Sequence, residues 1–363
     1  MRPLPLGRLL LGLCLGLAVT WSAARAADDK AKDDNTEKVK FNTVDGVELH
    51  GVFYPSDQPG KRAPCVMLLP KIGGNTSQEG WDELARDLQK AHYAVLLFDF
   101  RGQGDSTNVD PSFWNDTSTR PLAQLTALNR DLVRGYNRAN PKTTISFKDF
   151  NKAYYPVLVN DIAAAKGYLD QRNNNGDCNS SNLILIGAED GATLGALWLY
   201  TELGLYRATQ LQPLTERPLK FNNTPEGKDV AACVWLTISP TLGNQRPWVT
   251  TWLGYASREQ KVPMAFVYGE KDTAGAHFSK TCYAAAKTKS KLTGDWPIKN
   301  SKLAGNALLD SKLSAREWIV GSYLKAVKGE QVAPTWSEKD MEKAVYGWIA
   351  PGMRTSMVWK PKD

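Results

Sequence analysis

Gly187-Ala188-Glu189-Asp190-Gly191 is the stretch of the sequence that decides the fold. It follows the apolar run Leu183-Ile184-Leu185-Ile186 and precedes a run of small residues, Ala192-Thr193-Leu194-Gly195-Ala196. An apolar strand, a turn with two glycines and a small-residue helix form the context of a G-x-S-x-G nucleophile elbow. The glycines permit a strained turn that lifts the middle side chain to the edge of a sheet. Here that middle residue is Glu189 rather than serine.

Other short apolar runs along the chain are typical of buried strands. With the run before the elbow, they are Val66-Leu69, Val95-Phe98, Leu183-Ile186, Ala231-Ile238 and Met264-Tyr268. Helical patterns separate or follow them: Trp81 to Ala91, Leu158 to Gln171, Ala192 to Leu203, Phe278 to Ala286 and Ser314 to Lys328. This alternation predicts an α/β fold with a doubly wound, mainly parallel sheet and helices on both faces.

An antiparallel hairpin is expected ahead of this sheet. Residues alternate between apolar and polar from Val39 to Tyr54, and Asp45-Gly46 at the centre is a strong signal for a two-residue turn. Near the other end of the chain, Ser337 and Asp340 predict the start of a helix. The expected organisation is a signal peptide (1–26), a polar linker (27–37), an α/β domain (38–330) with insertions at 107–155 and 204–229, and a C-terminal extension (331–363).

The first 26 residues have the pattern of a secretory signal peptide. Arg2 and Arg8 give a basic start, an apolar stretch runs from Leu9 to Val19, and Ala24-Arg25-Ala26 matches an A-x-A cleavage site. The apolar stretch is shorter than the roughly 20 residues that a membrane-spanning helix needs. We therefore expect cleavage and export to the periplasm or the extracellular space, with no transmembrane segment in the mature chain.

Charge and cysteine content narrow the possible functions. The formal charge of +7 falls to +4 without the three arginines of residues 1–26, and the remaining basic residues are interspersed with acids. No nucleic-acid partner is therefore expected. Cys65 and Cys233 lie in apolar runs and are expected to be buried free thiols, whereas disulfide pairing of Cys178 and Cys282 is left open. No C-x-x-C occurs and the three histidines are scattered, so no metal and no cofactor are expected.

Three further motifs accompany the elbow in order along the chain. Each directly follows a predicted strand or includes its last residues: Leu68-Leu69-Pro70-Lys71-Ile72-Gly73-Gly74-Asn75, Asp99-Phe100-Arg101-Gly102-Gln103-Gly104-Asp105-Ser106 and Gly269-Glu270-Lys271-Asp272. Together with the elbow they resemble the α/β-hydrolase superfamily, in its serine esterase and peptidase branch. The resemblance covers roughly Val39 to Lys328. It implies that Leu183-Ile186 is central in the sheet, beside Val66-Leu69, with Met264-Tyr268 two strands further along.

The resemblance also implies a catalytic triad, two of whose members are missing. In the family a nucleophile, an acid and a histidine follow one another along the chain. Mapped onto this sequence, Glu189 takes the place of the nucleophile and Asp272 that of the acid, while Ala304 stands where the histidine is expected. The family's oxyanion pocket corresponds to Lys71 and Ile72 in the loop after one strand and to Asp190 after the elbow.

Substitutes for the missing groups are not evident. His277 follows Asp272 by five positions and belongs to the wrong loop, and His50 and His92 are expected to be structural. Haloalkane dehalogenases and epoxide hydrolases of this fold use aspartate at the elbow, but glutamate is one methylene longer. A covalent ester would also need a base for its release. We therefore expect Glu189 to be a non-catalytic carboxylate.

The sequence thus favours an exported pseudo-hydrolase rather than an enzyme. Such a protein would bind a small ligand or a protein partner of the envelope in the former active-site cleft, at the carboxyl ends of the strands. Two alternatives remain open. One is a hydrolase of esters or amides with a carboxylate centre at Glu189, or with Glu189 or Asp190 as general base. The other is an architectural envelope protein that uses the C-terminal extension and the aromatic insertion as contact surfaces.

The elbow carries two structural expectations. Glu189 should have strained backbone dihedrals, because Gly187 and Gly191 are both retained. Lys71 stands where the family usually has glycine, in the loop that faces the elbow. Because a partly buried carboxylate needs a partner, we expect an ion pair between Lys71 and Glu189. The alternative is that Lys71 points to water.

Overall fold

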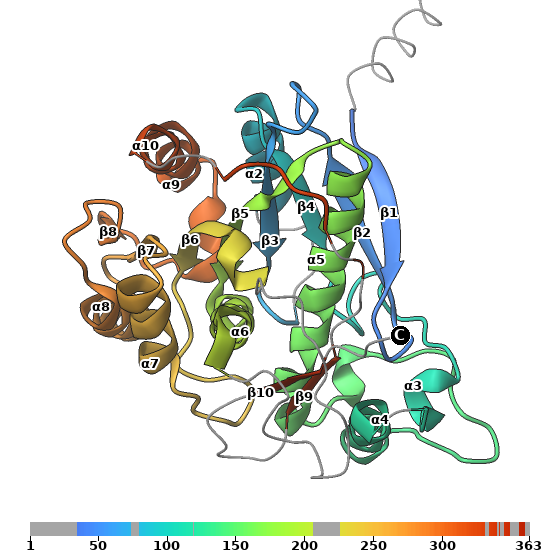
Figure 1. The fold of residues 1–363 in the computed structure, drawn as a ribbon. Coiled ribbons are helices and arrows are strands. Elements are labelled where there is room, and N and C mark those ends of the chain that lie inside the picture. Colours follow the sequence, from blue (N-terminus) through green and yellow to red (C-terminus); the bar gives the residue numbers. More distant parts are fainter. Residues whose placement is uncertain are drawn as a thin grey trace, which may run out of the picture. The chain divides into compact units, whose positions relative to one another are not determined.

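Eight strands form the central sheet of the computed structural model, in the order β1-β2-β4-β3-β5-β6-β7-β8 (Figure 1). The structure describes residues 35–73, 80–118, 120–205, 226–330, 334–339, 341, 345–348 and 356–359. The strands are β1 (Glu37–Asn42), β2 (Glu48–Tyr54), β3 (Pro64–Leu69), β4 (Ala94–Phe98), β5 (Asn179–Ala188), β6 (Val230–Leu236), β7 (Met264–Gly269) and β8 (Gly294–Ile298). In this sheet β2 pairs antiparallel with both of its neighbours, and all other pairings are parallel.

Helices cover both faces of the sheet (Figure 1). They are α2 (Trp81–Lys90), α3 (Ser112–Asn115), α4 (Arg120–Leu132), α5 (Val159–Asn174), α6 (Glu189–Tyr200), α7 (Val249–Gly254), α8 (Thr273–Ala286), α9 (Ala315–Trp318) and α10 (Lys325–Glu330), and a π-helical segment, η8 (Ile319–Leu324), joins the last two. Residues of α5, α6, α7 and α8 pack on one face, and residues of α2, α9, η8 and α10 pack on the other.

The strands are apolar throughout because both of their faces are buried. In β3, Cys65, Met67 and Leu69 point to one core, while Val66 and Leu68 point to the other. This is the period of two expected when successive side chains leave opposite faces of a sheet.

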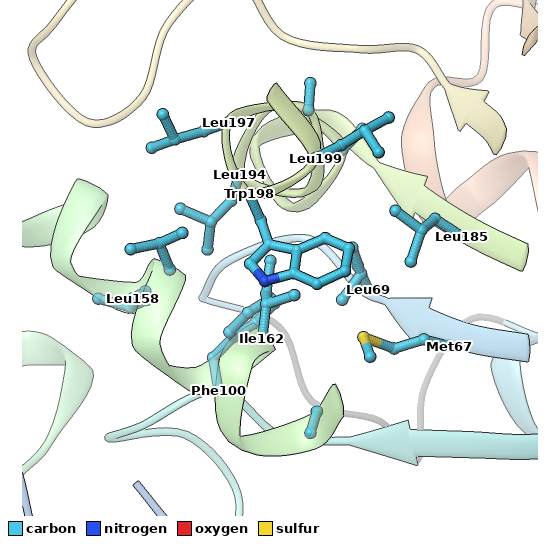
Figure 2. Packing of buried hydrophobic residues seen from close by; sticks show 14 of the residues in the cluster. Met67, Leu69, Phe100, Leu158, Ile162, Leu185, Leu194, Leu197, Trp198 and Leu199 are labelled. Carbon is cyan, nitrogen blue, oxygen red and sulfur yellow. The ribbon is translucent and has the colours of Figure 1, made fainter. Parts of the chain in front are cut away.

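Figure 2 shows the larger core, where the indole of Trp198 from α6 lies near Met67 and Leu69 of β3 and Ile162 of α5. Trp198 is fully buried. The helix that starts at the elbow is thereby fixed between the sheet and α5.

The expected fold class and strand order are confirmed. β5 is central, β3 lies beside it, and β7 is two strands further along on the other side. The opening hairpin of β1 and β2 forms an antiparallel edge. This order, with one reversed strand near the edge, is the α/β-hydrolase fold.

The hairpin turn differs from the expectation. The last pair of the ladder joins Asn42 to Glu48, so the connection has five residues rather than two. The Thr43 N–H donates to the Val47 carbonyl oxygen at 2.9 Å and closes the loop. The wider loop turns Asp45 inward, where its carboxylate is fully buried against Arg101.

Two other elements also departed from the sequence patterns. β8 was not predicted, because Asp295 and Pro297 interrupt its apolar pattern; proline is tolerated there because β8 is an edge strand. A helix start was expected at Ser337 and Asp340. The prediction is wrong at Ser337, because residues 334–339 are not helical, and Asp340 lies outside the described residues. β9 (Val345–Trp348) and β10 (Ser356–Trp359) form a separate antiparallel pair.

The insertion at residues 107–155 belongs to the core. Phe113 and Trp114 of α3 are fully buried, and the Trp114 ring lies 5.5 Å from that of Tyr136. Their burial removes the argument that the aromatic residues of this insertion form a contact surface. The segments 1–34 and 206–225, with the predicted signal peptide and most of the second insertion, lie outside the described residues. In the described part of the chain, no helix combines the length and apolar character needed to span a bilayer.

Arg101 of the Asp99–Ser106 turn ties this insertion to the sheet. Its guanidinium is fully buried and donates to Asp45 at 2.7 Å, to Asp161 at 2.7 Å and to the Tyr154 hydroxyl at 2.9 Å. The Tyr154 hydroxyl in turn donates to Asn129 of α4 at 2.6 Å. Buried charges are tolerated only when they are paired and hydrogen-bonded in this way.

Replacement of Arg101 by alanine should therefore destabilise the fold strongly. Two buried carboxylates would lose their cation, a loss that typically costs about 3–5 kcal/mol. As a control, Arg86→Ala removes a partly exposed ion pair with Asp82, which is worth about 0–1 kcal/mol. Denaturant unfolding of both variants measures the difference. Equal free energies of unfolding for the two variants would contradict the role assigned to Arg101.

Candidate functional site

The elbow is present at the carboxyl end of the central strand. β5 ends at Ala188, α6 begins at Glu189, and Glu189 has a φ of +47°. A positive φ is uncommon for a residue with a side chain, so the expected strain at this position is confirmed.

Both glycines of the elbow are required by close packing. A Cβ atom at Gly191 would lie 2.2 Å from the Pro70 carbonyl oxygen, and one at Gly187 would lie 2.7 Å from the Ala192 Cα atom. Neither approach is possible for a side chain. The start of α6 is therefore pressed against the end of β3, which places the loop after β3 beside the elbow.

The ion pair between this loop and the elbow is confirmed. Lys71 Nζ lies 2.7 Å from Glu189 Oε2, so the alternative in which Lys71 points only to water is wrong. The Lys71 side chain is 47% exposed and that of Glu189 is 26% exposed. Pairs with this much exposure contribute about 0–1 kcal/mol. The effect of the pair is therefore to neutralise and position the elbow carboxylate more than to stabilise the fold.

The Asp190 side chain occupies the oxyanion pocket. Its Oδ1 atom accepts a hydrogen bond from the Ile72 N–H at 2.9 Å. In α/β-hydrolases the oxyanion donors are the N–H of the residue after the nucleophile and an N–H of the loop after β3. In this chain the donor of that loop, the Ile72 N–H, is thus bound to an internal carboxyl group.

Asp190 has an unusual acidity. Burial raises the pKa of its carboxyl to about 6, and the Glu189 charge adds to the increase, while the Ile72 N–H and Lys71 act in the opposite direction. Desolvation penalises the charged form more than these two neighbours favour it. A carboxyl that titrates near pH 6 is suited to proton transfer, which makes it the one chemically distinctive group of the elbow.

Two amide side chains hold the loop after β3 in place. Asn306 Oδ1 accepts from the Lys71 N–H at 3.2 Å, and Gln103 Oε1 accepts from the Gly73 N–H at 3.0 Å. Neither was identified from the sequence as a site residue. Gln103 occupies a variable position of the Asp99–Ser106 motif, and Asn306 lies within the loop that was searched only for a histidine.

The loop expected to carry the histidine does lie at the elbow. A Cβ atom at Gly305 would be 2.4 Å from Glu189 Oε1, so the Glu189 side chain packs directly against this loop. Ala304 precedes that contact and offers no base. The same loop is tied to the turn after β7, because the Lys271 N–H donates to the Ser301 carbonyl oxygen at 2.7 Å.

Three of the remaining polar candidates have local partners. Asp272 is the N-cap of α8, and its Oδ1 atom accepts from the Gly275 N–H at 3.3 Å. His50 lies 2.9 Å from Glu48, and His92 lies 2.5 Å from Asp57. His92 has a φ of +71°, which agrees with its place at a position where the family usually has glycine. His277 is in the body of α8.

The cysteines of the described residues are all free and buried. The expectation that Cys65 and Cys233 are buried free thiols is therefore confirmed, and Cys178 and Cys282 are free as well. Within the same ranges, no group of three His, Cys, Asp or Glu side chains is arranged to hold a metal ion.

Comparisons with known proteins found similarity to solved structures only. No protein-family model matches the chain, and no curated protein sequence matches it. Similar solved structures include an esterase of Pyrococcus furiosus, with 14% identity and a TM-score of 0.45, covering 80% of this chain and 90% of that one. A dienelactone hydrolase from Anabaena variabilis has 13% identity, a TM-score of 0.47 and coverages of 81% and 96%. A hyperthermophilic esterase from the archaeon Pyrobaculum calidifontis has 12% identity and a TM-score of 0.48, covering 84% of this chain and 89% of that one.

Similarity at this level says nothing about the chemistry of this chain. The fold assignment therefore depends on the strand order, the single reversed strand and the positive φ at Glu189.

The acidity of Asp190 predicts a pH dependence of stability. Because the pKa of Asp190 is about 6 in the folded state and its ordinary value is 3.8, the folded state binds more protons between these two pH values. The Asp190 contribution to stability is therefore largest near pH 4 and declines as the pH rises to 6. Asp190→Asn keeps an acceptor for Ile72 but removes the titration. The melting temperature of this variant minus that of the unmodified protein should therefore increase from pH 4 to pH 6.

The comparison of the two proteins is needed because Asp161 titrates in the same range, with its pKa raised by burial to about 6. A difference in melting temperature that does not change from pH 4 to pH 6 would show that Asp190 has an ordinary acidity.

Proposed function

We propose that this protein is a non-catalytic protein of the α/β-hydrolase fold, which binds a small ligand or a protein partner at the carboxyl edge of its sheet. One observation carries the proposal: the Asp190 carboxyl accepts a hydrogen bond from the Ile72 N–H, the group of the loop after β3 that would stabilise an oxyanion. An oxyanion hole acts through donors that are free to bind the charge developing in the transition state. Here a substrate oxygen would have to displace an internal carboxylate first.

The other parts of the site support the same proposal. The nucleophile position holds a carboxylate paired with Lys71, and the acid position caps a helix. Ala304 provides no proton acceptor at the third position. The elbow and its supporting loops remain, and they shape the surface at the carboxyl ends of the strands. In sheets of this type, ligands bind at that edge.

The proposal predicts a null result with hydrolase reagents. A fluorophosphonate probe should label the purified protein no more than it labels a heat-denatured sample, and p-nitrophenyl butyrate should be hydrolysed at the rate of buffer alone. A known serine esterase serves as the positive control for both reagents. Specific labelling, or turnover that disappears in Glu189→Gln, would contradict the proposal.

The second candidate function is hydrolysis of esters or amides with a carboxylate as general base. The raised pKa of Asp190 favours it, because a base with a pKa of about 6 activates water effectively near neutral pH. This candidate requires Asp190 to leave Ile72 when substrate binds. Ester turnover with a pH midpoint near 6 would support this candidate over the non-catalytic proposal. The turnover should be lost in Asp190→Asn and retained in Asp272→Asn.

We also propose that the chain is exported, which the pattern of residues 1–26 supports. Expressed with its own N-terminus in a bacterium, the protein should be recovered outside the cytoplasm and should begin at Ala27, as measured by N-terminal sequencing and intact mass. Introduction of a proline after the predicted site, with Ala27→Pro, should block processing. Recovery of the full-length unprocessed chain from the cytoplasm would contradict export.

A further inference from the structure

A cavity of about 440 Å³ lies at the edge of the sheet opposite the elbow. Two loops form it: residues 257–263, which lead into β7, and residues 288–293, which lead into β8. Because β5, β7 and β8 run parallel, the amino ends of β7 and β8 face away from the edge that carries Glu189. The cavity is therefore separate from the former active site. Its volume is within the range of small-molecule sites, roughly 300–1,000 Å³.

The rim of the cavity is cationic. Arg258, Lys261 and Lys289 all line it and all are exposed, and none of its lining residues is acidic. Within the described residues, no ion pair joins any of these three side chains to a carboxylate. Lys261 Nζ donates to the Arg258 carbonyl oxygen at 2.5 Å, which uses one of its three protons. A cavity lined by charges of one sign concentrates ions of the opposite sign.

The floor of the cavity provides hydroxyl groups. Ser257 and Thr293 are 1% and 5% exposed, and their hydroxyl oxygens lie 3.4 Å apart. Thr293 Oγ1 also accepts from the Met264 N–H at 3.3 Å, which fixes it to the start of β7. A hydroxyl that accepts a hydrogen bond still has a proton to donate.

The wall of the cavity is preorganised. The hydroxyl of Thr288 accepts from the Ser290 N–H at 3.1 Å, and that of Ser290 accepts from the Leu292 N–H at 3.1 Å. Thr288 and Ser290 both line the cavity, so their protons can also face a ligand. Three cations and several hydroxyl donors, without an acidic side chain, match the needs of a tetrahedral dianion.

We propose that this cavity binds the phosphoryl group of a small molecule. Arg258 supplies a planar guanidinium that can donate two parallel hydrogen bonds, and Lys261 and Lys289 supply compact charges from the two opposing loops. The hydroxyls of Ser257 and Thr293 lie beneath the bound group. Binding relieves the repulsion among three cations whose charges the described part of the chain leaves unpaired.

Isothermal titration at low ionic strength tests the proposal with two probes, inorganic phosphate and glycerol 3-phosphate. We expect saturable one-site binding of at least one probe. The double variant Lys261→Gln/Lys289→Gln should weaken it by about tenfold or more, because hydrogen bonds to charged groups contribute that much. Lys325→Gln, an exposed lysine of α10 outside the cavity, is the matched control and should bind as the unmodified protein does. Glu189→Gln should also bind normally, so this test is independent of the proposed function.

Vesicles containing phosphatidylglycerol distinguish a soluble ligand from a lipid headgroup. Binding of the soluble probes that is lost in the double variant supports the proposal, and tighter binding of glycerol 3-phosphate than of phosphate shows that the cavity holds more than the phosphoryl group. Absence of binding by both soluble probes overturns the proposal, including when the vesicles bind. Soluble binding that is equal in the double variant and in Lys325→Gln overturns it as well. Thermal melting of each variant confirms that it is folded.

Discussion

The contact between the start of α6 and the end of β3 is the constraint on which the site depends. Gly191 lies so close to the Pro70 carbonyl oxygen that no side chain fits, and this approach fixes the two backbone segments that would form an oxyanion hole. Once they are fixed, Asp190 at the first turn of α6 reaches the Ile72 N–H, and Glu189 reaches Lys71. The elbow is therefore a packing feature of the fold, and it persists without the serine that gives it a catalytic use in hydrolases.

Charged side chains occupy the elbow, where a hydrolase has its nucleophile and its oxyanion pocket. A catalytic oxyanion hole keeps its donors preorganised and available for a transition state. In this chain the Ile72 N–H donates to the Asp190 carboxyl, and the carboxylate of Glu189 is neutralised by a cation from the facing loop. The two departures from the family pattern, Lys71 and Glu189, are consistent with one another. Without Lys71, the Glu189 carboxylate would be left unpaired at a partly buried position.

The fold could be predicted from the sequence because its signals are local. Apolar runs such as Leu183-Ile186 identify strands buried on both faces, and the glycine spacing of the elbow identifies the strand-turn-helix unit. The Lys71–Glu189 pair was also predictable, because the two departures from the family pattern have opposite charge. Other interactions between distant residues were not predictable. Arg101 meets Asp45 and Asp161, which are 56 and 60 residues away in the chain, and Asn306 meets Lys71 across 235 residues of chain.

The central claim is that Asp190 occupies the Ile72 N–H, the oxyanion donor of the loop after β3, and the amide proton of Ile72 reports on it most directly. In ¹H–¹⁵N spectra from pH 4 to 8, the Ile72 amide should move downfield with a midpoint near pH 6, as the Asp190 carboxyl that it binds loses its proton. The shift should be absent in Asp190→Asn. An Ile72 amide that does not titrate in the unmodified protein, or that titrates equally in Asp190→Asn, would show that the Asp190 carboxyl does not hold this donor and would contradict the account.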